Sequence, residues 1–404
     1  MRIRWMKPVI VSVLTAFGAL AGCEGSDPGT TTTTTSSTTT TTTSSTTTTT
    51  TTTTTGTGGS GTGGSGTGGT GGMVVVDPCE TYGVVTPMDG AACPHAATDF
   101  DPTNAANDGW AACVSDDNMY HPFDPNVSSN LRTIAFDDIG KLLGFGTVSA
   151  PDSKAFLDAQ LVYLQAEGIE SRVSRREDEH YAKAAKACNM MTPEELAMNV
   201  DRCVGPAQIQ PLINKAFEDG IAGVDPGANA ARIEAALLWF FYVSAHKEPH
   251  SCAKTQGDCD SATGYYAGTQ KRDEALGLAK YVKAHSPQAH DRIWDGFLAV
   301  RCWRDLDNPA GAAADLVMRD KAIAQLDKAL LRGMALILRQ KVEHIGCNPA
   351  WVGAKILGHV LDREATARDA AKAQIIRDEL AKANAADVDA KKVIDAIDAV
   401  FPCP

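Results

Sequence analysis

The chain has 404 residues with 37 basic and 49 acidic side chains, which gives a formal net charge of −12 at pH 7. An acidic surface repels phosphate backbones, which argues against nucleic acid as a partner. No cluster of basic residues is present to hold an anionic lipid surface. Beyond residue 72 about 330 residues remain, and that length is sufficient for one large or two modest domains.

Residues 1–23 have the features of an export signal. Three basic residues precede an apolar run over residues 8–20, and Cys23 follows closely. The run is shorter than the roughly 20 residues that a membrane-spanning helix needs. A charged start, a short apolar stretch and small residues before a cleavage point are typical of a secretory signal peptide.

The end of this signal, Leu20-Ala21-Gly22-Cys23, resembles the lipobox of bacterial lipoproteins. The resemblance implies cleavage before Cys23 and acylation of Cys23 by fatty acids such as palmitate. Several acyl chains on one residue anchor a protein stably to a membrane. Because Glu24 rather than Asp follows the cysteine, we expect the anchored protein at the outer membrane of the cell envelope.

Residues 24–72 are predicted to form a disordered stalk. Residues 30–55 are only Thr and Ser, and residues 56–72 are almost all Gly with a few Thr and Ser. Such tracts have no apolar surface to offset the entropy of ordering. A flexible coil of roughly 49 residues spans about 35–42 Å. The stalk is either a bare spacer or, as Ser/Thr-rich tracts can be, O-glycosylated.

The cysteines predict disulfide bonds rather than a metal or redox motif. Of 11 cysteines, removal of the lipidated one leaves an even number, and an exported chain can form up to five disulfides. Short separations favour local pairing of Cys188 with Cys203 and of Cys252 with Cys259. No C-x-x-C motif occurs in the chain.

The part beyond the stalk divides by character. Residues 73–150 are rich in Asp, Asn, Pro and Gly and predict an irregular, disulfide-pinned segment. Residues 151–404 predict a helical domain, with helix starts at Thr192-Pro193 and Ser286-Pro287. The stretch Ala235–Val243 is apolar on every face and predicts a buried central helix.

These patterns predict an all-α fold, an antiparallel helical bundle or array of about eight helices stapled by disulfides. One internal echo occurs in the helical part. Residues 234–238 (Glu-Ala-Ala-Leu-Leu) resemble residues 327–331 (Asp-Lys-Ala-Leu-Leu). The echo reflects either a duplication of bundle halves or the coincidence of two Ala/Leu-rich helices.

The strongest polar constellation is His246, Glu248 and His250, at the end of the predicted central helix. Two imidazoles and a carboxylate suit a divalent or iron ion. Pro249 disfavours helical geometry at the preceding residue, so we expect the shared helical face to be broken and the histidines to decorate a helix end. A second candidate group contains His285 and His290, and convergence of the two groups would strengthen the metal hypothesis.

Three hypotheses for function follow. The first is a membrane-anchored envelope lipoprotein that displays a helical binding or structural module for an envelope protein or ligand, without enzymatic activity. The second is a periplasmic metal or small-ligand binder. Its exported all-helical architecture is similar to that of the imelysin-like, iron-associated proteins, but their G-x-H-x-x-E motif is missing and His359-x-x-Asp362 is only a near match. The third is an envelope hydrolase that uses His246, Glu248 or the carboxylates near Asp305.

Overall fold

The computed structural model describes residues 77, 79–88, 95–103, 109–165, 168–307 and 311–402. The predicted export signal with Cys23, the predicted stalk, Cys93 and Cys403 lie outside these residues. Within the described part the fold is all-α without strands, as predicted. None of the described helices is long and apolar enough to cross a membrane.

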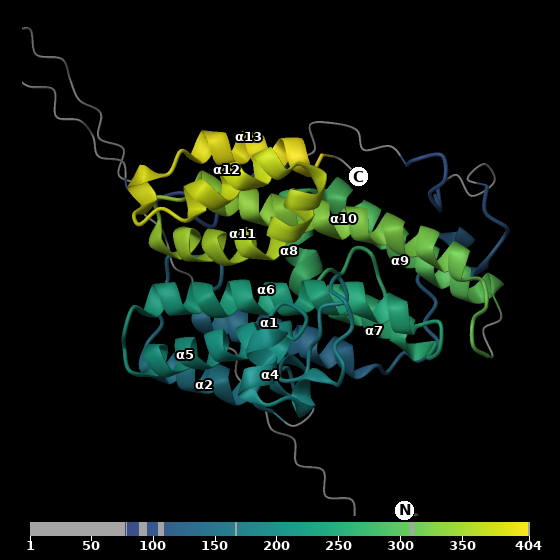
Figure 1. Ribbon diagram of the computed structural model, residues 1–404, viewed down its shortest axis with the longest axis horizontal. Helices are drawn as coiled ribbons and strands as arrows, with labels where there is room; N and C mark the ends of the chain where they lie inside the picture. Colours follow the sequence, from purple (N-terminus) through teal and green to yellow (C-terminus); the bar gives the residue numbers. More distant parts are fainter. Residues whose placement is uncertain are drawn as a thin grey trace, which may run out of the picture. The chain divides into compact units, whose positions relative to one another are not determined.

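The described residues form thirteen α-helices, more than the eight or so expected, because several helices are very short. They are, in chain order (Figure 1), α1 (Ser128–Leu143), α2 (Ser153–Tyr163), α3 (Glu170–Val173), α4 (Pro193–Met198), α5 (Gln210–Ile221), α6 (Pro226–Ser251), α7 (Gly257–Ala267), α8 (Gly277–His285), α9 (Pro287–Leu306), α10 (Leu316–Glu343), α11 (Asn348–Arg368), α12 (Ala370–Leu380) and α13 (Ala390–Val400). Single turns of 3-10 or π-helix add η1 (Val114–Asp117), η2 (Cys188–Met190), η3 (Gly205–Ile209) and η4 (Ala385–Asp387).

Both helix starts predicted from Pro at the first helical position are confirmed. Helix α4 begins with a capping box, in which the Glu195 N–H donates to the Thr192 hydroxyl and the Thr192 N–H donates to the Glu195 carboxylate. Helix α9 begins in the same way, with the Ser286 hydroxyl accepting from the Ala289 N–H. Local side-chain chemistry therefore determines where these helices begin.

The irregular segment is shorter than predicted, because α1 lies inside residues 73–150. One face of α1 is buried through Phe136, Ile139 and Leu143, as in an ordinary amphipathic helix. The opposite face also carries large apolar residues, of which Leu131 is 68% exposed. Apolar residues on both faces hide the periodicity from which a helix is predicted.

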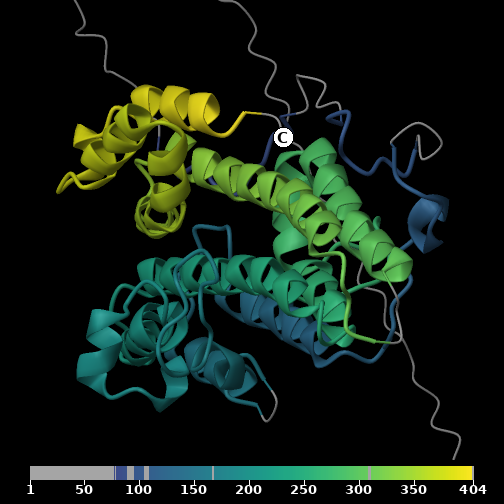
Figure 2. The same ribbon diagram turned by 45° about the vertical axis from the view of Figure 1, so that its right-hand side comes forward.

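The two longest helices, α6 and α10, run antiparallel and contact each other (Figures 1 and 2). All nine residues of the predicted central stretch Ala235–Val243 are buried in α6, as expected. Toward the start of α6, Lys341 Nζ of α10 donates to Glu234 Oε2 at 3.0 Å. Toward its end, His246 Nε2 lies 3.6 Å from Asp327 Oδ1 of α10. Polar groups thus meet at both ends of an otherwise apolar contact.

The irregular segment before α1 is fastened to helices that follow much later in the chain. Cys79 forms a disulfide with Cys347, which precedes α11, and Cys113 forms one with Cys302 of α9. Between them, the backbone of Phe100 exchanges two 2.8 Å hydrogen bonds with the buried Gln325 amide of α10. The segment is therefore tied to α9, α10 and the start of α11.

The two local cysteine pairs favoured by the sequence are disulfide-bonded in the structure. Cys188 and Cys203 have Cα atoms 5.3 Å apart and enclose α4. Cys252 and Cys259 have Cα atoms 5.2 Å apart and join the end of α6 to the start of α7. Both bonds hold the chain next to residues that enter the candidate site below.

We predict that the double substitution Cys79→Ser with Cys347→Ser lowers the free energy of unfolding by about 2–4 kcal/mol, because the bond closes a long loop in the unfolded chain. Urea denaturation followed by far-ultraviolet circular dichroism measures the change. The single substitution Thr81→Ser, in the same segment, is the control. An unchanged denaturation midpoint in the double variant would contradict the prediction.

Candidate metal centre

Helix α6 runs through Pro249 to Ser251, so the prediction that this proline breaks the helical face is wrong. A proline removes only its own N–H bond, and near a helix C-terminus few further bonds depend on it. The face therefore survives, and the rings of His246 and His250 lie with centroids 5.0 Å apart. His246 is buried at 6% exposure rather than decorating a helix end.

Glu248 is held in a buried ion pair and takes no part in the histidine cluster. Arg176 Nη1 donates to Glu248 Oε1 at 2.8 Å, and the side chains are 5% and 11% exposed. The guanidinium also lies 5.5 Å from the ring centre of Phe240 and 5.1 Å from that of Tyr265. This pair fixes the residue before Pro249 in helical geometry and helps to explain why the helix continues.

The partner of His246 comes from the loop after α3, which the sequence did not single out. Arg202 holds this loop, with its guanidinium donating to the carboxylates of Glu177 and Glu179 at 2.6–3.1 Å. The same guanidinium donates to the Asp178 and Tyr181 carbonyls, and the Asp178 N–H donates to the Arg202 carbonyl. One buried arginine thus fixes the loop that carries the next histidine.

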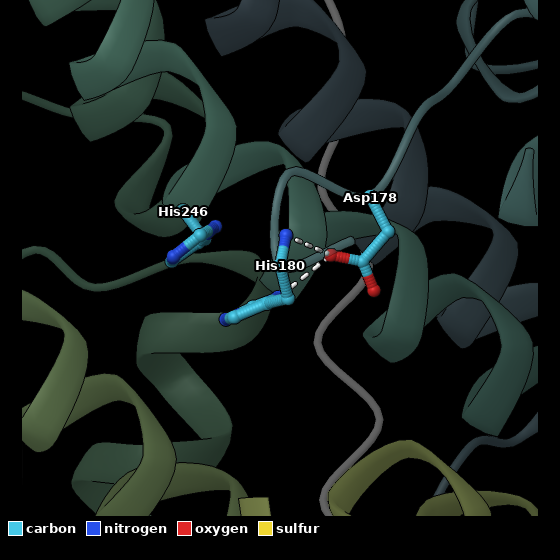
Figure 3. A group of neighbouring side chains, drawn as sticks. All are labelled: Asp178, His180 and His246. Atoms are coloured by element: carbon cyan, nitrogen blue, oxygen red, sulfur yellow. Dashed lines mark hydrogen bonds and ion pairs between the residues drawn. The ribbon is translucent and has the colours of Figure 1, made fainter. Parts of the chain in front are cut away.

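That histidine, His180, stacks on His246 with ring centroids 3.6 Å apart and planes inclined by 16°. Figure 3 shows Asp178 and His246 on opposite sides of His180. Asp178 Oδ1 lies 2.6 Å from His180 Nδ1 and also accepts from the His180 N–H at 3.0 Å. Asp178 therefore fixes the orientation of the His180 ring and turns its Nε2 atom toward α10.

Asp327 of α10 completes the cluster. Its Oδ1 atom lies 3.6 Å from His180 Nε2 and 3.6 Å from His246 Nε2, beyond hydrogen-bond distance from either. This oxygen is buried and has no hydrogen-bond partner, although the side chain as a whole is 26% exposed. Two imidazole nitrogens and one carboxylate oxygen thus lie close to one another.

These separations suit a metal ion. Two ligand atoms on one tetrahedral zinc ion, each 2.0–2.1 Å from it, lie about 3.3–3.4 Å apart. The ligand atoms of Asp178, His180 and His246 also lie within 4.8 Å of one another. Asp178 then holds the position of an outer carboxylate, which fixes the tautomer and direction of a metal-binding histidine. Two imidazoles with one carboxylate suit zinc, iron, copper or nickel.

Ion binding needs the two imidazole lone pairs to converge, and nearly parallel rings do not achieve this. The Nδ1 atom of His246 is buried without a hydrogen-bond partner. His180, in contrast, is held at Nδ1 by Asp178. The ring of His246 is therefore the less constrained of the two.

The electrostatics of the two histidines differ. Burial lowers the pKa of His180, but the hydrogen bond to Asp178 and the negative charges of Asp178 and Asp327 outweigh burial and raise it to about 9. Burial, followed by the charge of His180, lowers the pKa of His246 to about 3. In the absence of a metal the stacked rings therefore share one positive charge between two carboxylates, and a divalent cation would replace that proton.

The second predicted group does not join this cluster. His290 is buried with both ring nitrogens engaged, Nδ1 at 2.9 Å from the Tyr266 hydroxyl and Nε2 at 2.8 Å from the Arg272 carbonyl oxygen. His285 ends α8, and its Nδ1 lies 2.6 Å from the Tyr281 carbonyl oxygen. Of the five predicted metal residues the structure brings His246 and His250 together, and the other three lie in separate environments.

Sequence reasoning missed His180 and Asp327 because each is far from His246 along the chain. The available signals were the Asp178-x-His180 spacing in an acidic loop and the acidic residue that opens the second copy of the internal echo. Neither signal indicates that the three elements meet. The meeting depends on the register of α6 against α10 and on the loop held by Arg202.

We predict that Glu248→Ala lowers the free energy of unfolding by about 3–5 kcal/mol, because it leaves the Arg176 guanidinium buried without its partner. Urea denaturation measures the loss. Glu274→Ala, which removes a carboxylate that is 61% exposed, is the matched control and should change stability little. Equal stability of the two variants would contradict a structural role for Glu248.

Comparison with known protein families, curated proteins and solved structures finds no match for this chain. Fold alone does not determine function, and here it does not provide an analogy either. The function is therefore argued from the chemistry of the cluster formed by His180, His246, Asp327 and Asp178.

Proposed function

We propose that this protein is a membrane-anchored lipoprotein of the cell envelope whose helical module binds a divalent transition-metal ion. The observation that carries the proposal is the position of Asp327 Oδ1, 3.6 Å from the Nε2 atoms of both His180 and His246. This carboxylate oxygen is buried without a hydrogen bond, and the proton on the stacked histidines balances its charge. A metal ion binds this oxygen and both nitrogens at once and replaces the 3.4 Å contact between His180 Nε2 and the Tyr242 hydroxyl.

The arrangement favours reversible binding over a closed structural site. Structural zinc sites use four protein ligands, whereas three protein ligands leave a coordination position open for water or another ligand. Asp327 is 26% exposed as a side chain, so the cluster lies near the surface of the fold. Next to the cluster, the half-buried His250 lines a cavity of about 670 Å³ and has a buried Nε2 without a hydrogen-bond partner.

Export and anchoring rest on the lipobox resemblance at Cys23 and gain support from the disulfides. Four disulfides join cysteines of the described part, two of them between residues far apart in the chain. Disulfides form and persist in oxidising compartments outside the cytoplasm. A chain that carries both a lipobox-like sequence and this disulfide framework is consistent with an envelope location.

The module hypothesis without a metal also has one supporting feature. Leu157, Leu161 and Leu164 form a row along α2 and are 47–59% exposed. Such a row supports a contact surface but has no chemistry that identifies a partner. The hydrolase hypothesis is weaker, because Glu248 pairs with Arg176 and the Asp305 carboxylate accepts from the Val114 N–H. The metal site therefore carries the proposal.

We predict that the mature protein, stripped with a chelator and kept in detergent, binds one Zn²⁺ per chain in isothermal titration calorimetry. His180→Ala and His246→Ala should each abolish this binding, because two ligands alone hold the ion poorly. Asp178→Asn should weaken it about 10–100-fold, the usual effect of losing an outer partner of a metal-binding histidine.

The matched control is His121→Ala, which removes a histidine whose side chain is 38% exposed and whose Nε2 lies 2.7 Å from an aspartate, Asp117. This variant should bind zinc like the unmodified protein. Circular dichroism establishes that each variant is folded. Zinc binding that survives both His180→Ala and His246→Ala, or no binding of Zn²⁺, Fe²⁺ or Cu²⁺ by the folded unmodified protein, would refute the proposed site.

We predict that Cys23→Ser moves the protein from the membrane fraction to the soluble extracytoplasmic fraction, because the acceptor of the acyl chains is lost. Incorporation of radiolabelled palmitate in a bacterial host, followed by fractionation, measures both effects. The substitution Ser26→Ala near the same site is the control. Labelled, membrane-bound Cys23→Ser protein would contradict lipidation at this residue.

A further inference from the structure

A second site lies at the other end of the α6–α10 contact. A cavity of about 290 Å³ opens beside Glu234 and Lys341. Three aromatic rings line it, with the ring centroid of Phe136 5.6 Å from that of Phe145 and 5.9 Å from that of Tyr281. Small-molecule sites are concave and mainly apolar with a few convergent polar groups, and this cavity has that character.

Residues 79–88 form a strap that closes one side of the cavity. The strap is fixed at its start by the Cys79–Cys347 disulfide and at its end by the Met88 N–H, which donates to the His285 carbonyl oxygen at 2.8 Å. Gly83 has φ +95°, and a Cβ there would lie 2.4 Å from the Gly146 carbonyl oxygen. Only glycine allows the strap to approach the loop after α1 so closely. The disulfide and this close approach therefore hold the cavity wall in place.

The charges at the base of the cavity are fully paired within the protein. Lys341 and Glu234 have side chains only 3% and 1% exposed, with their charged atoms 3.0 Å apart. The Tyr281 hydroxyl donates to the other Glu234 oxygen at 2.8 Å, and Lys341 donates to the Tyr82 hydroxyl at 3.3 Å. Gly353 of α11 leaves the space that the Lys341 stem occupies. This pair has no net charge to offer a ligand.

The ionisable groups nearer the surface carry both signs of charge. Burial raises the pKa of Asp137, and the positive charge of Lys280 acts in the opposite direction. Lys141 donates to Asp138 at 2.7 Å. A charged ligand would lose its hydration without meeting an uncompensated opposite charge, which is strongly unfavourable.

Polar groups that can recognise a neutral ligand remain in the wall. Because His285 Nδ1 lies 2.6 Å from a carbonyl oxygen, that nitrogen carries the proton and Nε2 is a hydrogen-bond acceptor. The Gln340 amide and the Thr147 hydroxyl also line the cavity. They provide donors and acceptors next to the aromatic rings.

We infer that this cavity binds a small uncharged aromatic compound that carries a hydroxyl or amide group. The half-buried rings of Phe145 and Tyr281, packed against the buried Phe136, supply apolar surface on which a planar ring packs favourably. Glu234 and Lys341 fix the base of the site, and the polar side chains of the wall fix the orientation of the ligand. This site is independent of the proposed metal centre.

The test uses three probes with the same phenol ring and different charge, namely 4-hydroxyphenylethanol, 4-hydroxyphenylacetate and tyramine. Isothermal titration calorimetry with the chelator-treated mature protein in detergent should show 4-hydroxyphenylethanol binding at least tenfold more tightly than either charged probe. Ala284→Trp, at an exposed position on the rim of the cavity, should abolish this binding without affecting the fold. Ala371→Trp, at an exposed position of α12 away from the cavity wall, should leave it unchanged.

Three results would overturn the inference. The first is that none of the probes binds at millimolar concentration. The second is that a charged probe binds as tightly as the neutral one or more tightly, which contradicts the balance of charges in the wall. The third is that binding persists in Ala284→Trp, which places the ligand elsewhere. Because the metal ligands are intact in both tryptophan variants, zinc titration of the same samples separates this outcome from failure of the metal site.

Discussion

The antiparallel contact between α6 and α10 is the constraint on which both sites depend. Glu234 meets Lys341 at one end, and His246 meets Asp327 at the other. A buried charge without its partner costs several kcal/mol. A slip of one helical turn, about 5.4 Å, would separate both pairs at once, so the polar ends fix the register that the apolar middle leaves open. The metal cluster and the aromatic cavity follow directly from this register.

The internal echo, residues 234–238 and 327–331, lies at the same contact. Its two acidic residues, Glu234 and Asp327, open equivalent stretches of α6 and α10, and each faces a basic group toward the far end of the other helix. The surrounding helices recur in the same order. Helices α6, α7 and α8 begin at residues 226, 257 and 277, and α10, α11 and α12 begin at residues 316, 348 and 370. This near-constant separation favours duplication over coincidence. The two stretches have different partners, a lysine at one end and histidines at the other.

Local features of the fold could be predicted from the sequence, whereas the site depended on contacts between distant residues. The cap formed by Thr192 and Glu195 and the burial of Ala235–Val243 follow from chemistry within one or two helical turns, and both were predicted. The position of His180 could not be predicted, because the Arg202 side chain places it and Arg202 lies beyond α4 in the chain. The run through Pro249 was mispredicted for a similar reason. A residue that precedes a proline disfavours helical geometry, but at Glu248 the buried ion pair with the distant Arg176 outweighs this preference.

The two ends of the α6–α10 contact differ in whether their buried polar atoms have partners within the protein. This difference determines which kind of ligand suits each end. At the cavity end the Lys341 ammonium and the Glu234 carboxylate find partners within the protein, so the site has no net charge and suits a neutral ligand. At the other end Asp327 Oδ1 and His246 Nδ1 remain buried without hydrogen bonds, although Asp178 holds His180 firmly. Buried polar atoms without a hydrogen bond are rare in proteins, and an ion is one of the partners that can explain them. We propose that a divalent cation binds Asp327 Oδ1 at that end, whereas the cavity end requires only a molecule that fits its shape.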